Sequence, residues 1–223
     1  MLGNILITGG ASGLGRATVE AVAKAGGRPL VVDVRLPEGD VDFVQADLAD
    51  REQAERAVRE LVERAGGLGG VVTAAGIDAC GRLEDVPAAD WDRVIKVNLL
   101  GTAAVVRAAL PYLDGRVVTV ASTLGLRAVS DATAYCAAKF GVVGFTRALA
   151  TELAGRVGVT LLVPGGMRTA FFDGRDERYR PGPDARLNQP EDVAATIVFA
   201  LGQPPGCEIR ELVVCPATET SWP

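Results

Sequence analysis

The chain of 223 residues contains no histidine and only three lysines. The missing histidine excludes Ser-His-Asp and Cys-His nucleophile systems, histidine-ligated metals and every mechanism that uses imidazole as an acid or base. If the chain is an enzyme, tyrosine, lysine or carboxylate side chains must carry its proton transfers.

Cysteine is scarce as well. The four residues of this type are Cys80, Cys136, Cys207 and Cys215. They form no Cys-x-x-Cys pair and no spacing typical of metal ligands, so we expect no metal site. Scattered thiols of this kind favour a reduced, cytoplasmic setting.

Positive charge and long apolar runs are also in short supply. The net charge of -5 offers no basic surface for nucleic acid. No stretch approaches the roughly eighteen apolar residues of a membrane span, and the first residues lack the basic segment of a secretory signal. A hydrophobic content of 48% with 23% charged residues is typical of a globular protein. We therefore expect neither a membrane nor a nucleic acid as partner.

What the sequence does contain is a regular alternation of short apolar runs with longer helical patterns. The expected strands are residues 4–8, 29–33, 42–46, 70–74, 116–121, 159–163 and 212–215. The expected helices lie near residues 14–25, 51–65, 88–113, 134–153 and 190–201. Uninterrupted apolar strands indicate a parallel sheet covered on both faces. The pattern predicts an α/β protein with a single Rossmann domain over residues 1–223, built on a doubly wound seven-stranded parallel sheet.

Tyr135 and Lys139 are four residues apart on an expected helix, which places both side chains on one face. An ammonium group beside a phenol favours the phenolate and lowers the phenol's pKa. The pair is thus a candidate acid/base near neutral pH. The alternative interpretation is a half-buried tyrosine ring beside a solvated lysine.

A glycine-rich turn follows the first strand and opens the first helix. Its candidate pyrophosphate-binding residues are Gly9, Ser12, Gly13, Leu14 and Gly15. Asp33 ends the second strand, where a carboxylate accepts ribose hydroxyls and repels a 2′-phosphate, which favours NAD and leaves NADP open because Arg16 and Arg35 lie near. Asp47, ahead of Leu48, could meet the adenine edge. For both aspartates, capping of a turn is the alternative.

Several residues lie at or just past the carboxyl ends of predicted strands. They are Thr8, Asp33, Asp47, residues 74–76, Ser122 and Pro164. The carboxyl ends of parallel strands form one edge of the sheet, where ligands bind in doubly wound folds. Random polar residues would be spread over both edges.

Together these motifs resemble the short-chain dehydrogenase/reductase family. The resemblance rests on Thr8-Gly-x-x-x-Gly13-x-Gly15, Asn98, Ser122 thirteen residues before Tyr135, the Tyr135–Lys139 pair and Pro164-Gly165-x-x-x-Thr169. It implies an NAD(P)-dependent oxidoreductase acting on a ketone or secondary alcohol. One departure is Thr73-Ala74-Ala75-Gly76, where the family usually has Asn-Asn-Ala-Gly.

The resemblance also implies residue roles. Tyr135 would be the acid/base, Lys139 would lower its pKa and bind the nicotinamide ribose, Ser122 would polarise the substrate oxygen, and Asn98 would hold a water in a proton relay. The implied cofactor contacts are Gly9, Ser12, Gly13, Leu14, Gly15, Asp33, Asp47, Leu48, Ala75, Gly76, Tyr135, Lys139, Pro164, Gly165, Met167 and Thr169.

The remaining expectations concern substrate, assembly and alternative functions. The long irregular segment at residues 170–188 predicts a substrate loop over a small carbonyl or alcohol compound. Similar proteins are commonly oligomers, so we expect a homodimer or homotetramer. The competing hypotheses are a catalytically silent dinucleotide-binding sensor or scaffold, and an epimerase or dehydratase of the extended group, for whose substrate domain 223 residues leave little room.

Overall fold

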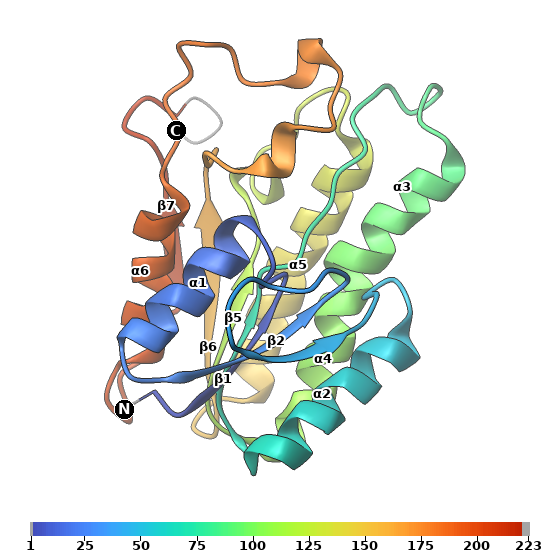
Figure 1. Cartoon of the computed structure of the whole chain (residues 1–223). Helices are drawn as coiled ribbons and strands as arrows, with labels where there is room; N and C mark the ends of the chain where they lie inside the picture. The colour runs from blue at the N-terminus through green and yellow to red at the C-terminus, as the bar shows by residue number, and fades with distance from the viewer. Residues whose placement is uncertain (1, 220–223) are drawn as a thin grey trace.

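The computed structural model describes residues 2–219, and these form one seven-stranded parallel sheet between two layers of helices (Figure 1). The strands are β1 (Asn4–Thr8), β2 (Arg28–Asp33), β3 (Asp42–Gln45), β4 (Leu68–Thr73), β5 (Leu113–Val120), β6 (Gly158–Pro164) and β7 (Glu211–Val214). Their order is β3-β2-β1-β4-β5-β6-β7, with every neighbouring pair parallel. The predicted doubly wound sheet is confirmed.

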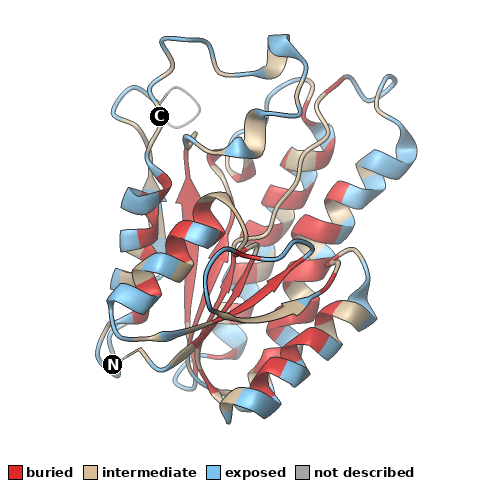
Figure 2. Cartoon of the chain, viewed as in Figure 1, coloured by how far each residue is buried: buried red, intermediate tan, exposed pale blue. Residues whose placement is uncertain are grey.

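The helices cover both faces of this sheet. They are α1 (Gly13–Lys24), α2 (Arg51–Ala65), α3 (Ala88–Ile95), α4 (Thr102–Ala109), α5 (Thr133–Glu152) and α6 (Pro190–Leu201). Apolar side chains of α1 and α6 pack on one face, and those of α2 and α4 pack on the other. The central strands β1, β2, β4, β5 and β6 are mostly buried (Figure 2), as their apolar sequences predict, whereas the edge strands β3 and β7 are partly exposed.

Helix boundaries follow local sequence signals. The Asp50 carboxylate caps α2 by accepting from the amides of Glu52 and Gln53, and Gly66 ends that helix with a left-handed φ of 80°. Pro190 occupies the first turn of α6, where a missing amide hydrogen has little cost. Short-range chemistry therefore explains why the predicted helix 51–65 has the observed bounds.

The expected single helix at 88–113 differs from the structure. A π-helical segment (Lys96–Gly101) joins α3 to α4, and a 3-10 turn (Leu110–Tyr112) follows. The run Ala88–Tyr112 has a mean hydropathy of 1.4 over its most apolar window and is long enough to cross a membrane. The expectation that no segment has such a composition is therefore wrong. Half of that window is buried inside the protein, where this run contacts α2 and α5.

Candidate active site

The carboxyl ends of the strands open into a cleft of about 1500 Å³. Most of the predicted site residues line it: Gly9, Ser12, Gly13, Leu14, Asp33, Asp47, Leu48, Ala75, Gly76, Ser122, Tyr135, Lys139, Pro164, Gly165, Met167 and Thr169. Gly15 and Asn98 do not line the cleft and lie behind its wall. The topology thus brings together residues that are up to 160 positions apart, as a shared sheet edge requires (Gly9 to Thr169).

The glycine turn leaves a shallow cradle at the start of α1. Gly9 has a φ of 75°, and a side chain there would come within 2.8 Å of the Ala75 Cα atom. A side chain on Gly15 would collide with the Gly9 carbonyl oxygen, so this glycine lets α1 pack closely against β1. Ser12 precedes the helix without a capping bond from its side chain. The first turn of α1 therefore presents amide groups and the positive end of the helix dipole to the cleft.

Asp33 is fixed at the end of β2. One carboxylate oxygen accepts from the Ala11 amide and the other from the Arg35 amide, each at 2.9 Å. The Arg35 guanidinium turns away from this carboxylate and donates to the Ser12 hydroxyl at 2.8 Å. The aspartate therefore both shapes the turn and lines the cleft, so its two interpretations do not compete.

Asp47 likewise combines two roles. One of its oxygens accepts from the Ala49 amide at 2.9 Å, which is the turn-capping bond of the alternative interpretation. Its other oxygen pairs with Arg93 of α3 at 3.0 Å. The carboxylate borders the cleft at the same time, beside Leu48.

Ser122, Tyr135 and Lys139 meet where β5 ends and α5 begins. The Ser122 hydroxyl accepts from the Leu124 amide at 3.1 Å, and it lines the same cleft as the Tyr135 phenol. The Lys139 Nζ atom lies 5.6 Å from the centre of the Tyr135 ring and donates to the Val120 carbonyl oxygen at 2.8 Å. Lys139 is only 4% exposed. The interpretation of Lys139 as a solvated surface cation is therefore wrong.

The electrostatics of this pair differ from the expectation. Burial lowers the pKa of Lys139 from an ordinary 10.5 to about 8, against an opposing effect of Asp78. Burial also raises the pKa of Tyr135 above its ordinary value, and Asp78 adds to the increase, while Ser122 and Arg175 oppose it. Burial therefore outweighs the groups that lower the phenol's pKa, and the lowered pKa expected from the Tyr135–Lys139 spacing is not found.

Asn98 lies in the π-helical segment, where a widened turn lets its side chain reach the loop after β4. Its amide nitrogen donates to the Ile77 carbonyl at 2.8 Å and its amide oxygen accepts from the Ile77 N–H at 2.9 Å. A side chain on the neighbouring Gly76 would lie 3.6 Å from the Asn98 amide oxygen and 3.8 Å from Lys139 Nζ. The Asn98 side chain therefore holds this loop beside Lys139, and its expected role in a water relay stays a prediction.

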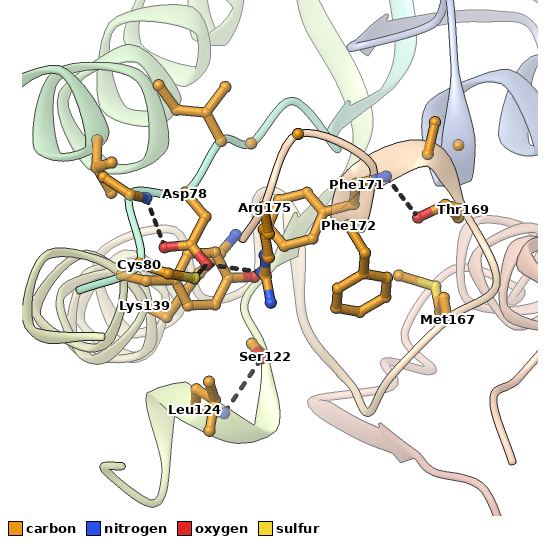
Figure 3. A pocket seen from close by; sticks show the side chains of 18 of the residues that line it. Asp78, Cys80, Ser122, Leu124, Lys139, Met167, Thr169, Phe171, Phe172 and Arg175 are labelled. Carbon is orange, nitrogen blue, oxygen red and sulfur yellow. Dashed lines mark hydrogen bonds and ion pairs between the residues drawn. The ribbon is translucent and has the colours of Figure 1, made fainter. Parts of the chain in front are cut away.

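Two charged residues in the cleft have no counterpart in the sequence-based prediction. The Arg175 guanidinium and the Asp78 carboxylate form an ion pair at 2.6 Å, although they are 97 residues apart (Figure 3). The pair is largely shielded from solvent, with the Arg175 side chain 17% and the Asp78 side chain 7% exposed. The Cys80 thiol donates to the same carboxylate at 3.1 Å. Burial and this carboxylate raise the pKa of Cys80 to about 12, which makes the thiol a poor nucleophile.

Comparison with known proteins decides the family. The sequence profile described as short chain dehydrogenase matches residues 3–180. The chain belongs to the short-chain dehydrogenase/reductase family. Members of this family are NAD(P)-dependent oxidoreductases that interconvert carbonyl and hydroxyl groups, and this chain is such an enzyme.

Individual members of the short-chain dehydrogenase/reductase family support the assignment over nearly the whole chain. The 3-oxoacyl-[acyl-carrier-protein] reductase of Thermotoga maritima is 34% identical over 217 residues, which cover 87% of this chain and 88% of that protein. The levodione reductase of Leifsonia aquatica is 32% identical, with 88% and 86% covered.

Solved structures of the family agree. A levodione reductase structure has a TM-score of 0.82 at 30% identity and covers 96% of both chains. A short chain dehydrogenase of Burkholderia cenocepacia in complex with NADP has a TM-score of 0.85 at 26% identity, with 96% and 97% covered.

The departure from the family at Thr73 has a visible consequence. Thr73 ends β4 in register with Thr8 of β1 and Thr119 of β5, so three hydroxyls share one row of the sheet. Thr8 accepts from the Ala75 amide at 3.1 Å and Thr119 bonds Thr146 at 2.6 Å. The Thr73 hydroxyl is buried without a hydrogen-bond partner among residues 2–219. The smaller side chain therefore leaves a polar atom unsatisfied at the centre of the sheet edge.

Proposed function

We propose that this enzyme transfers a hydride between a nicotinamide cofactor and a ketone or secondary alcohol, with Tyr135 as the acid/base. The observation that carries the proposal is that Ser122, Tyr135 and the buried Lys139 all line one cleft at the sheet edge, with the Lys139 Nζ atom 5.6 Å from the centre of the Tyr135 ring. A tyrosine, a lysine and a hydroxyl supply the proton chemistry that a chain without histidine needs.

The residues of the cleft fit a dinucleotide. Gly13, with a φ of 53°, and the uncapped first turn of α1 face the cleft and suit a pyrophosphate. Asp33 and Asp47 would contact the adenosine half, and Met167 with Thr169 would contact the nicotinamide half. Bound there, the cofactor supplies or accepts the hydride.

The proton follows a separate route from the hydride. In the direction of reduction, the Tyr135 hydroxyl donates its proton to the substrate carbonyl oxygen, and in oxidation the phenolate removes it from the alcohol. Ser122 donates a hydrogen bond to the same substrate oxygen, which stabilises the negative charge that develops on it. Lys139 interacts better with phenolate than with phenol, so its positive charge favours the form of Tyr135 that accepts a proton.

NAD is the proposed cofactor. The Asp33 carboxylate is held toward the adenosine end by the Ala11 and Arg35 amides, where it would repel a 2′-phosphate. The Arg35 guanidinium is engaged with Ser12. Arg16, the other arginine through which NADP could gain affinity, is paired with Glu20 and Glu38.

The substrate pocket is formed by residues 170–188. A β-bridge between Met167 and Asn188 joins the two ends of this segment. Phe171 and Phe172, near its start, line the cleft. The Phe171 ring lies 5.7 Å from the Tyr135 ring, so the apolar wall borders the proposed acid/base directly. A partly apolar carbonyl compound suits this pocket, in line with relatives that are named for 3-oxoacyl and levodione substrates.

A catalytically silent sensor is the weaker alternative, because Tyr135 and Lys139 are both present and both line the cleft.

We also propose that the protein is a cytoplasmic homodimer or homotetramer. Phe140 on α5 and Leu100 on the π-helical segment are each 45% exposed, and apolar side chains of this size are suited to a subunit contact. Light scattering after size exclusion measures the assembly.

The proposed activity is tested by following absorbance of NADH and of NADPH with a panel of ketones, and of NAD with the matching secondary alcohols. We expect reduction of at least one ketone with NADH preferred. Tight cofactor binding without turnover of any carbonyl or alcohol would support the silent sensor instead.

A further inference from the structure

Glu219 follows β7 in the chain and lines the cleft beside Pro164, Gly165 and Gly166. Its Oε2 atom accepts a hydrogen bond from the Gly166 amide at 3.2 Å. A side chain on Gly165 would come within 2.5 Å of the same oxygen. The carboxylate therefore lies directly against the turn that follows β6.

Backbone hydrogen bonds place the Glu219 carboxylate at this turn. The Gly165 amide donates to the Val214 carbonyl at 2.9 Å, which joins the end of β6 to the end of β7. The Glu219 amide donates to the Pro216 carbonyl at 2.9 Å and closes a turn at residues 216–219. This second turn brings the chain back toward β6, so that the glutamate side chain reaches Gly166.

The turn after β6 belongs to the nicotinamide half of the proposed cofactor site. Met167 and Thr169, the proposed nicotinamide contacts, follow Gly166 closely and line the same cleft. Like residues 164–166, they carry no charge. Glu219 thus brings a negative charge to a part of the cleft wall that is otherwise built from uncharged residues.

The loop at residues 170–188 adds charges of both signs to the cleft. With Asp78, the ion-pair partner of Arg175, these charges cancel: Arg175, Asp176, Arg178, Asp184 and Arg186. The loop therefore adds no net charge that would oppose an effect of Glu219.

The nicotinamide ring is positively charged in the oxidised cofactor and uncharged in the reduced one. A fixed carboxylate nearby attracts the first form and has little effect on the second. We infer that Glu219 is a specificity-determining residue that makes the site bind the oxidised cofactor in preference to the reduced one. This inference deepens the proposed function and rests on it.

The same charge acts on the proposed reaction. In reduction, a hydride with its two electrons leaves the cofactor for the substrate carbon, and the proton on Tyr135 passes to the substrate oxygen. Positive charge develops on the nicotinamide as the hydride leaves. Glu219 stabilises that charge, so it favours formation of the alcohol on the enzyme.

The test compares dissociation constants of wild type and Glu219→Gln for NAD and NADH. Fluorescence titration measures NADH, and competition against NADH measures NAD. Glutamine keeps the size of the side chain and an oxygen that can accept from the Gly166 amide, and it loses the charge. We expect the ratio of Kd for NAD over Kd for NADH to rise about 3- to 10-fold. If wild type prefers the phosphorylated cofactors, NADP and NADPH are titrated in the same way.

Two controls isolate the charge at Glu219. ADP-ribose lacks the nicotinamide, so its Kd should stay within about twofold of wild type in Glu219→Gln. Glu63→Gln makes the same chemical change at an exposed residue of α2, and its ratio of Kd values should also stay within about twofold. Thermal unfolding of each variant checks that it is folded.

The outcomes separate this inference from the proposed function. If wild type binds both oxidation states and the ratio does not rise in Glu219→Gln, the inference is wrong and the proposed function stands. If the variant binds NAD, NADH and ADP-ribose more weakly by the same factor, Glu219 only supports the turn and the inference is again wrong. If wild type binds none of the four nicotinamide nucleotides, the proposed function fails and the inference fails with it.

Discussion

Replacement of Lys139 by methionine should make the protein more stable and inactive. Methionine has nearly the length of lysine and fills the same buried space without a charge. The pKa of Lys139 is lowered from 10.5 to about 8 because the charged form is disfavoured by burial. A lowering of this size corresponds to about 3 kcal/mol of destabilisation at neutral pH. The substitution removes this cost.

The gain must be reduced by what the variant loses. The Val120 carbonyl would lose the hydrogen bond that Lys139 donates at 2.8 Å, at a cost of about 1 kcal/mol. The net increase in the free energy of unfolding is therefore about 2 kcal/mol at pH 7. For a chain of this length that corresponds to a rise in Tm of roughly 4–8 °C.

The sign of the pH dependence follows from the direction of the pKa change. The native state disfavours charged Lys139, so the cost is fully present below the native pKa of about 8 and disappears as pH rises to the unfolded value of 10.5. The advantage of Lys139→Met over wild type should thus shrink to about 1 kcal/mol at pH 9.

Urea unfolding at pH 7 and pH 9 measures both quantities. The control is Lys96→Met, which changes an exposed lysine and should alter stability by less than about 0.5 kcal/mol. A variant less stable than wild type at pH 7, or a gain that does not shrink with pH, would refute the assignment of Lys139 as a costly buried cation retained for chemistry.

Three further outcomes are expected. Asp33→Asn should lower the ratio of kcat/KM for NADH over NADPH at least tenfold, because the charge that repels a 2′-phosphate is lost; an unchanged ratio would contradict the role of Asp33. Gly15→Ala should weaken cofactor binding in fluorescence titrations and lower Tm, because the added methyl group meets the Gly9 carbonyl oxygen; wild-type values of both would contradict the close packing. Thr73→Val should raise the free energy of unfolding by about 1 kcal/mol, because it removes a buried hydroxyl that lacks a partner; a loss of stability would show that this hydroxyl is satisfied.

The parts of the fold that the sequence predicts are those with local signals. Uninterrupted apolar runs such as the one at residues 4–8 mark the strands, and Asp50 and Pro190 mark helix starts. The π-helical segment at residues 96–101 was not predictable in this way. Its apolar residues continue the period of the flanking helices, and the widened turn is associated with the long-range bonds between Asn98 and Ile77.

The same division holds for the active site. The glycine turn and the spacing of Tyr135 and Lys139 are local patterns, and the structure places them at one cleft. The pair of Asp78 and Arg175 joins two irregular segments 97 residues apart, and neither belongs to a motif. The spacing of four residues also gives no information on burial, which is why the direction of the Tyr135 pKa was wrong.

The most direct test of the central claim is the rate of Tyr135→Phe. The substitution removes only the phenol oxygen, so the ring contact with Phe171 is retained. We expect kcat/KM for ketone reduction to fall by a factor of about 10²–10⁴ while the dissociation constant for NADH stays within about threefold of wild type. A Tyr135→Phe enzyme that reduces the ketone as fast as wild type would contradict the role of Tyr135 as the acid/base.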